Sequence, residues 1–367
     1  MWFRLEQRQE ASRAMVYLSP VVAVFLTVLA AMIMFAVLGV DPVKAIFSFF
    51  IEPISSRDGL AELCVKATPL ILIGVGLAIG FQADVWNIGA EGQLIIGALA
   101  AGGLGLAFYN QSSIFLVPAM LVSGVFGGMA WAAVPAWLKT RFNTNEILTS
   151  LMLTYVGFLV LSYLVHGPWK DPEGQNFPES RLFHDSALIP TLIEGTRLNA
   201  GWLIALAAVL IGWVFIARHI VGFQVRVVGM APKAASFAGF KEKRLVWLTL
   251  LISGGAAGLA GAIEISGAIG QIVPSISPGY GFTAIIVAFL GRLHPVGVFF
   301  AGLLMALTYL GGDSAQITMN LPNAVTGVFQ GMLLFFLLAC DVFIRYRFKV
   351  GRAGAGQTAA KYSKAIE

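Results

Sequence analysis

Residues 60–97 contain the stretch that decides the fold, LAELCVKATPLILIGVGLAIGFQADVWNIGAEGQLIIG. Residues 60–81 are mostly apolar, the next ten or so are mixed and polar, and a second apolar run, 93–109, follows. A membrane-spanning helix needs about 20 consecutive apolar residues. The stretch therefore predicts two spans joined by a short polar connection.

The same pattern extends over the whole chain. Hydrophobic residues make up 58% of its 367 residues and charged residues only 12%, whereas soluble domains carry about 25% charged residues. We read ten apolar segments: 16–39, 60–81, 93–109, 114–138, 147–165, 200–217, 245–265, 281–291, 295–311 and 324–344. The segment 281–291 is too short to cross alone as a straight helix. The predicted fold class is all-α, a polytopic transmembrane helix bundle of about ten spans, within a range of eight to ten.

Basic residues predict the orientation, because cytoplasmic loops collect Lys and Arg. With the N-terminus inside and ten alternating spans, 18 of the 24 basic residues fall on the cytoplasmic side. Both termini are then cytoplasmic. Residues 166–199 form an outer loop, and residues 218–244 form the longest internal cytoplasmic loop. We expect one transmembrane domain over 1–350 and a cytoplasmic tail over 351–367 without stable structure.

The polar connection between the first two quoted spans is the first candidate site. It places Asn87, Glu91 and Gln93 where the chain otherwise avoids such residues, and polar groups at membrane depth usually face a cavity or a partner. If residues 87–93 are helical, Asn87 and Glu91 share one face. The alternative is an ordinary cytoplasmic loop followed by a capped helix.

The cytoplasmic loop is the second candidate site. Pro232 is placed to start a short helix and Gly239 to end it. So short a helix has no reason to be stable by itself, which favours a docking element for another protein. The alternative is a solvated connector whose lysines only set the topology.

Two further polar positions lie near a glycine-rich span. Glu264 follows GGAAGLAG, a pattern that suits close helix packing, and it could touch a translocation path. Gln271 is the last residue of GLAGAIEISGAIGQ, which is weakly similar to GLAIGFQADVWNIGAEGQ at 76–93. The similarity is either an internal repeat, as many transporters have, or a chance likeness of two glycine-rich helices. Lys66 lies four residues after Glu62, the order that favours a helical ion pair.

The chain lacks the sequence motifs of several common enzymatic and binding functions. The chain has no GxxxxGK[ST] motif for ATP hydrolysis and no HExxH metal motif. The basic residues lie beside spans rather than along an aromatic-lined face, so nucleic acid is not an expected partner. We expect no catalytic residue, no metal and no cofactor, and contact with membrane lipid.

Three blocks, in order, carry a family resemblance. The run NIGAEGQ, Asn87–Gln93, resembles the signature of bacterial ABC importer permeases of the nucleoside and simple-sugar branch, relatives of branched-chain amino-acid and ribose permeases. The loop GFQVRVVG, Gly222–Gly229, looks like that family's coupling loop, with Val227 and Met230 as mild departures. Residues 279–297 of this chain resemble the third conserved block of the same family. The residues that match the coupling loop are Gly222, Arg226, Gly229, Pro232, Ala234, Ala235 and Gly239.

The resemblance implies a fold similar to type II ABC importers in the bacterial cytoplasmic (inner) membrane. It implies a cytoplasmic ABC ATPase subunit that holds the ATP, a second homologous permease, and an extracytoplasmic solute-binding lipoprotein or periplasmic binding protein. Asn87, Glu91, Gln93, Glu264 and Gln271 would form the translocation core. The NIGAEGQ form favours a nucleoside as the solute.

Other functions stay open at this point. The same importer could carry a simple sugar or a riboflavin-like solute. Spans, a broken helix and an in-membrane Glu264 would fit an ion-coupled secondary transporter equally well. A membrane scaffold or receptor that transports nothing is a third possibility.

Overall fold

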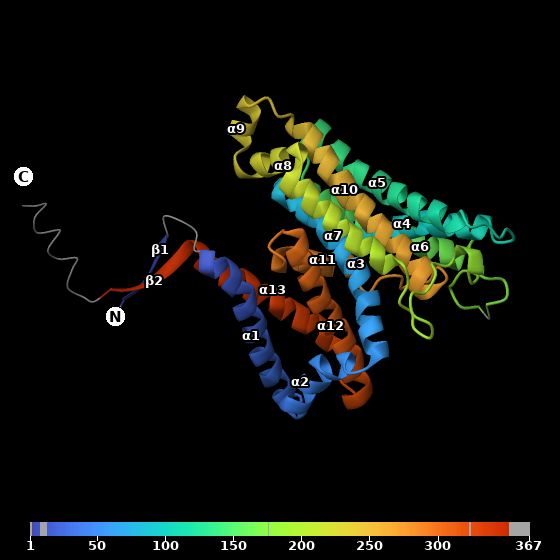
Figure 1. Cartoon of the computed structure of the whole chain (residues 1–367), viewed down its shortest axis with the longest axis horizontal. Coiled ribbons are helices and arrows are strands. Elements are labelled where there is room, and N and C mark those ends of the chain that lie inside the picture. Colours follow the sequence, from blue (N-terminus) through green and yellow to red (C-terminus); the bar gives the residue numbers. More distant parts are fainter. Residues whose placement is uncertain (1, 8–12, 175, 323, 352–367) are drawn as a thin grey trace, which may run out of the picture. The chain divides into compact units, whose positions relative to one another are not determined.

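A computed structural model describes residues 2–7, 13–174, 176–322 and 324–351 (Figure 1). The helices in these ranges are α1 (Arg13–Val37), α2 (Pro42–Phe50), α3 (Arg57–Gln82), α4 (Ala90–Ala107), α5 (Leu116–Phe142), α6 (Glu146–His166), α7 (Gly201–Arg218), α8 (Ile220–Met230), α9 (Pro232–Phe237), α10 (Glu242–Ile263), α11 (Tyr280–Leu290), α12 (Pro295–Met319) and α13 (Ala324–Arg345). Short turns of other helical types are η1 (Glu52–Ile54), η2 (Asp185–Ala187) and η3 (Glu264–Ile269). The strands are β1 (Trp2–Gln7) and β2 (Tyr346–Gly351).

The predicted helical class is confirmed, and nine helices in the described ranges are long and apolar enough to cross a membrane. The segment predicted to be too short is α11, which has 11 residues. The sequence analysis did not predict the small antiparallel sheet in which β1 pairs with β2. The exact span count, the sidedness of the termini and the extent of the permease domain stay predictions, and residues 352–367 of the expected tail lie outside the described residues.

The chain divides into two compact units. One comprises residues 1–46 and 327–367 and contains α1, most of α13 and the sheet. Within it, Ser19 of α1 donates a hydrogen bond of 2.7 Å to the carboxylate of Asp341 in α13, which satisfies two polar groups within apolar helices. The other unit, residues 47–326, carries all the candidate site residues.

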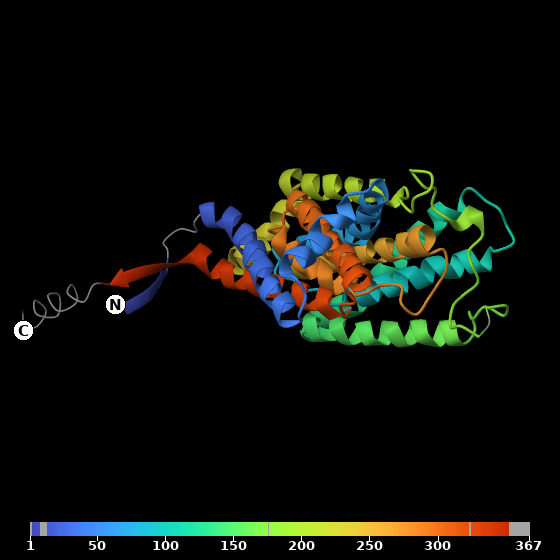
Figure 2. The ribbon, with the colours of Figure 1, turned by 90° about the horizontal axis from the view of Figure 1, so that it is seen from below.

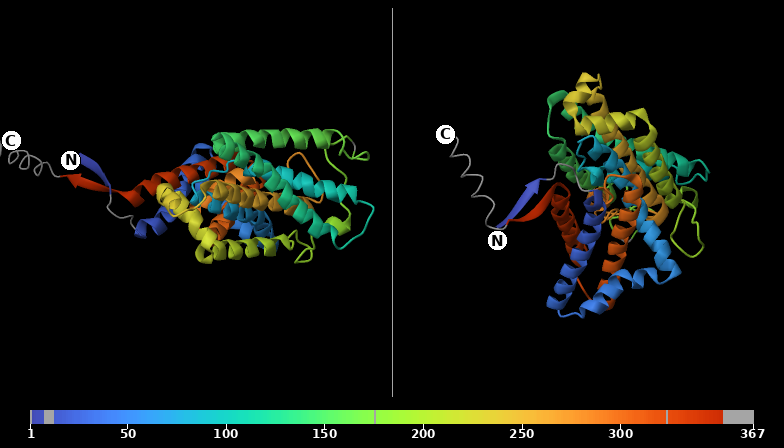
Figure 3. Two further views of the ribbon diagram at one scale, coloured as in Figure 1. Left: turned by 90° about the horizontal axis from the view of Figure 1, so that it is seen from above. Right: turned by 60° about the vertical axis from the view of Figure 1, so that its left-hand side comes forward.

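The centre of the larger unit is a group of long helices, in which α10 packs against α3, α4 and α5. The helices α6 and α7 lie on opposite flanks, α6 against α4 and α7 against α3 (Figures 2 and 3). Almost the whole of α3 after Val65 is buried, and Pro69 interrupts its hydrogen-bond ladder. α3 is thus a central rod of the unit.

Small residues explain how closely the central helices approach. A Cβ on Gly258 of α10 would meet the carbonyl oxygen of Gly124 and the backbone of Gly128, both in α5. Gly97 of α4 in turn lies against the backbone of Gly258. Close backbone approach through glycine is the usual way for helices to associate in lipid, so the packing expected from GGAAGLAG is present.

The two ends of the larger unit differ in character. The short helices α8 and α9 lie at one end of the bundle, and the long loop between α6 and α7 lies at the other (Figure 1). Lys and Arg placement predicts that the α8–α9 end is cytoplasmic.

Candidate functional site

The polar connection 83–89 separates α3 from α4 without helical structure. Asp84 adopts a left-handed conformation with φ of 57°, which turns the chain after α3. α4 begins at Ala90, so the condition for Asn87 and Glu91 to share one helical face is not met, and the segment is a loop followed by a helix. Asn87 instead lies in the connection, because its side chain satisfies backbone and side-chain partners that a helical position would not reach.

Asn87 and Gln93 form a reciprocal amide pair. The amide nitrogen of Asn87 donates to Gln93 Oε1 at 2.7 Å, and Gln93 returns a hydrogen bond of 3.1 Å to Asn87 Oδ1. Asn87 also donates to Ser253 Oγ of α10 at 2.8 Å. Both amides are buried. The pair holds the α3–α4 connection against α10, and it is closed to solvent in this conformation.

Glu91 lies in the first turn of α4 and is fully buried. Its carboxylate accepts a hydrogen bond of 2.6 Å from the backbone N–H of Gly281, in the first turn of α11. Ser277 Oγ accepts from the N–H groups of Gly279 and Tyr280. The otherwise unpaired donors at the start of α11 are therefore satisfied by side chains, one of them a carboxylate at the positive end of the helix dipole.

Glu264 and Gln271 contact other residues than the Asn87, Glu91 and Gln93 group does. Glu264 begins the π-helical turn η3 and lines a small cavity together with Thr68 of α3 and Asn199. Gln271 donates a hydrogen bond of 3.0 Å to Glu179 of the outer loop. The structure thus brings Asn87, Glu91 and Gln93 into one buried region, whereas Gln271 belongs to the outer-loop contacts. A role of the five residues in translocation stays a prediction.

The predicted ion pair between Glu62 and Lys66 is wrong. Glu62 pairs with Arg197 of the outer loop, and Lys66 Nζ lies 3.1 Å from Asp313 Oδ2 of α12. Partners that are distant in sequence are available to both side chains because α3 lies between α7 and α12. One pair between helices and one pair between a helix and the outer loop replace the local pair.

The cytoplasmic loop folds as predicted at both ends of its short helix. α9 starts at Pro232, and Gly239 follows it with φ of 80°, the left-handed conformation that commonly ends helices. The structure adds α8, an 11-residue helix over Ile220–Met230. Every residue of the predicted coupling set lies on α8, on α9 or directly after α9.

These residues divide into a buried and an exposed group. Gly222 and Ala235 are buried, and Gly229 lies against the backbone of Gln82 at the end of α3. Arg226, Pro232, Ala234 and Gly239 are exposed. Ala235 belongs to an apolar cluster that includes Ile79 of α3, Val228 of α8 and Leu245 of α10. The cluster attaches α9 firmly to the central helices.

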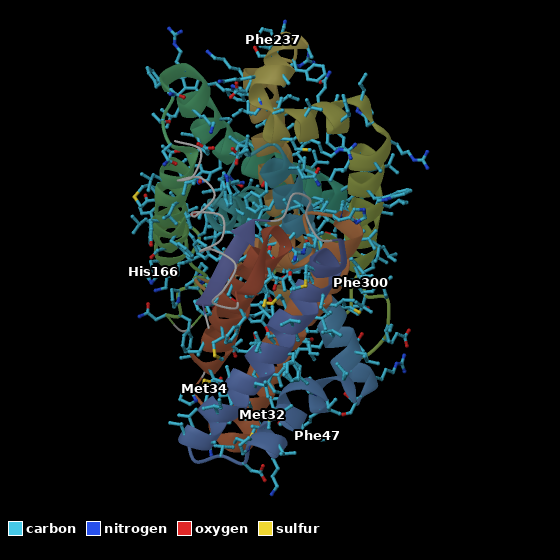
Figure 4. The ribbon with its side chains drawn as sticks, turned by 90° about the vertical axis from the view of Figure 1, so that its left-hand side faces the viewer. Met32, Met34, Phe47, His166, Phe237 and Phe300 are labelled. Carbon is cyan, nitrogen blue, oxygen red and sulfur yellow. The ribbon has the colours of Figure 1, made fainter. Side chains whose placement is uncertain are left out.

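Two large apolar side chains at this end were missed by the sequence analysis. Phe237 is 94% exposed and lies at the tip of α9 (Figure 4). Met230 is 85% exposed at the end of α8. Lys233, Lys241 and Lys243 lie in the same loop. The sequence feature that could have revealed Phe237 is its position among small and basic residues, in a segment predicted to lie outside the membrane.

Comparisons with known proteins agree with this architecture. The family model described as branched-chain amino acid transport system / permease component matches residues 59–338. The glucose ABC transporter permease protein TsgB13 of Haloferax volcanii is 36% identical over 94% of this chain and 93% of its own length. The guanosine ABC transporter permease protein NupP of Bacillus subtilis is 29% identical over 90% of this chain and 94% of its own.

Among solved structures, an inward-facing putative metal-chelate type ABC transporter matches with a TM-score of 0.46 and 16% identity, over 88% of this chain and 99% of that one. The family match covers most of the chain, including both the polar connection and the cytoplasmic loop. The chain belongs to the branched-chain amino acid transport system permease component family and is a multi-pass membrane permease of the ABC transporter class.

Proposed function

We propose that the chain is the membrane-spanning subunit of an ATP-driven importer for a nucleoside or a simple sugar, with α9 as the element that couples it to a separate ATPase. The observation that carries the proposal is the exposed Phe237 on a helix that is itself packed onto the central bundle. Large side chains are frequent among the few residues that carry most of the binding energy of a protein interface, and Phe237 extends from a segment predicted to lie outside the membrane.

The ATPase partner would bind Phe237 and Met230 in an apolar pocket. The neighbouring lysines would meet acidic residues at the rim of that pocket, since opposite charges favour the correct partner. The permease itself holds no ATP and performs no covalent chemistry in this proposal. ATP-driven closure of two ATPase subunits would move α9 of each permease.

The attachment of α9 explains how such a movement would reach the membrane. Ala235 and Val228 are packed against Ile79 and Leu245, so α9 cannot move without the cytoplasmic ends of α3 and α10. Packed helices shift between discrete arrangements rather than deform continuously. Two arrangements with the central path open to opposite sides would give alternating access.

The remaining partners follow from the class of transporter. A second homologous permease would complete the pathway, and an extracytoplasmic solute-binding lipoprotein or periplasmic binding protein would deliver the solute. The names of the two relatives quoted above divide between a sugar and a nucleoside. Both solutes carry a hydroxylated ring, and we propose that chemical class for this chain.

The experiment compares Phe237→Ala with Phe177→Ala in the assembled transporter. Phe177 is also strongly exposed but belongs to the outer loop. Loss of a central aromatic anchor costs 2 kcal/mol or more, so we expect ATPase binding to weaken by about 30-fold in Phe237→Ala. Membrane insertion should stay intact, and Phe177→Ala should bind as the parent does. Normal coupled uptake by Phe237→Ala would contradict the proposal.

An ion-coupled secondary transporter is the rival function. Uptake of labelled guanosine and glucose is measured in cells that lack the partner ATPase, and in complete cells treated with an uncoupler. The proposal requires uptake to be lost in the first case and kept in the second while ATP is maintained. The reverse result would favour the secondary transporter.

A further inference from the structure

The outer end of α12 carries a polar stripe within a candidate span. Asp313 and Gln316 are exposed three residues apart in α12, which places them on one face of the helix, and the exposed Asn320 directly follows its last residue, Met319. The side chain of Asp313 is 52% exposed. It lies six residues before the end of α12, or about 9 Å from Met319 at 1.5 Å per residue.

Lys66 of α3 faces this stripe. Its Nζ lies 3.1 Å from Asp313 Oδ2, and its side chain is 20% exposed. Lys66 is nine residues after the start of α3, about 14 Å along the helix. The ion pair therefore lies inside two spans rather than beyond their ends.

The neighbouring polar side chains Ser314 and Thr318 have hydrogen-bond partners on α2 and η1. Ser314 and Thr318 contact Ser48 Oγ of α2 at 3.2 and 3.1 Å. Glu52 accepts hydrogen bonds from Ser48 and Ser314. These contacts fix the rotation of α12, so the stripe keeps its exposed orientation.

Lipid is a poor neighbour for such a stripe. Ionisable side chains within spans almost always face a protein interior or a water-filled cavity, because a charge in hydrocarbon costs several kcal/mol. A carboxylate that is half exposed, with the exposed amide of Gln316 beside it, would place two polar groups against acyl chains. Water on this face removes that cost.

We infer that Lys66, Asp313 and Gln316 line the outer mouth of the solute pathway and bind the hydroxyl groups of the transported ring; the inference rests on the proposed function. The carboxylate accepts hydrogen bonds from hydroxyls, the ammonium donates them, and the amide does both. The pair carries no net charge. It therefore suits an uncharged polyhydroxylated ring, which sugars and the ribose of nucleosides share.

The first test measures access of water to the stripe. Asp313→Cys and Gln316→Cys are made separately in a Cys64→Ser, Cys340→Ser background of the assembled transporter. Intact cells are treated with MTSET, a membrane-impermeant thiol reagent. Phe300→Cys is the control, because Phe300 lies on the same helix and is strongly exposed but is surrounded by apolar residues.

We expect both stripe cysteines to react and the control to stay unmodified. Reaction at both positions should change when ATP and vanadate trap the transporter, because alternating access opens the pathway to one side at a time. No reaction at either stripe position would show that lipid or another subunit covers the face, and would overturn the inference. Reaction that is the same in both states would place the stripe on the outer surface rather than in the pathway, and would overturn it as well.

The second test assigns the ligand. Glucose or guanosine is added during labelling at concentrations that saturate uptake. Protection by glucose alone assigns a sugar, protection by guanosine alone assigns a nucleoside, and protection by neither overturns the binding role. Gln316→Ala should raise the half-saturation concentration about five- to tenfold, as expected for one lost hydrogen bond.

A charge swap separates binding from mere structure. The double variant Lys66→Asp, Asp313→Lys keeps an ion pair but exchanges donor and acceptor. We expect the double variant to insert into the membrane normally but to have a higher half-saturation concentration for uptake than the parent transporter. Uptake equal to that of the parent would assign the ion pair a structural role only. ATP-driven uptake with an unreactive stripe would defeat this inference alone, whereas uptake that persists without the partner ATPase would defeat the proposed function.

Discussion

The carboxylate of Glu91 accepts a hydrogen bond of 2.6 Å from the backbone N–H of Gly281, a residue 190 positions later in the chain. A Cβ on Gly281 would collide with the backbone of Ala90 and Glu91, so only glycine allows this approach. The contact joins the first turns of α4 and α11, each of which follows an interruption after a long helix. Helices interrupted in this way, with facing N-termini, are a recurring feature of transporters.

Glu91→Ala should destabilise the protein, because the Gly281 N–H would lose its buried acceptor. An unsatisfied buried donor costs about 1–3 kcal/mol. Glu91→Gln keeps an acceptor oxygen and should cost less. Thermal unfolding of the purified permease in detergent would check the order, and equal losses for the two variants would mean that this hydrogen bond is not what stabilises the junction.

The amide pair of Asn87 and Gln93 can be tested by a double-mutant cycle. Asn87→Ala and Gln93→Ala should each cost about 1–3 kcal/mol, since each leaves the other amide unsatisfied. The double variant should cost less than the sum, with a coupling of about 0.5–3 kcal/mol. Additive losses in thermal or denaturant unfolding would contradict the pairing.

Gly258→Ala and Gly331→Ala make the same chemical change in two helices. A Cβ at Gly258 would contact the backbone of α5, and we expect a loss of about 1–3 kcal/mol from the forced separation of α10 and α5. A Cβ at Gly331 meets nothing within 4 Å. There the change should be neutral or stabilise by up to about 1 kcal/mol. Similar unfolding temperatures for both variants would argue against the close crossing.

Much of the fold was predictable because apolar runs of span length allow few structures other than helices in lipid. The ends of α9 were predictable for a local reason: Pro232 suits the first turn of a helix, and Gly239 tolerates the left-handed conformation that follows one. These features depend on residues that are close in sequence.

The contacts that define the candidate sites depend on residues that are far apart. Nothing near Lys66 in the sequence reveals that Asp313 is its partner, and the local choice, Glu62, is taken by Arg197. The same holds for Asn87, whose place outside the helix follows from Gln93 and from Ser253 on a different helix. Exposure is likewise a tertiary property, which is why Phe237 went unnoticed.

α3 takes part in both regions, since Ile79 packs in the apolar cluster with α9 and Lys66 pairs with α12. Between these two residues stands Pro69, where the helix lacks one backbone hydrogen bond and bends more easily. A push on the cytoplasmic half of α3 can therefore change its tilt without dragging the outer half by the same amount. The two halves of one helix could then open and close at different moments of a transport cycle.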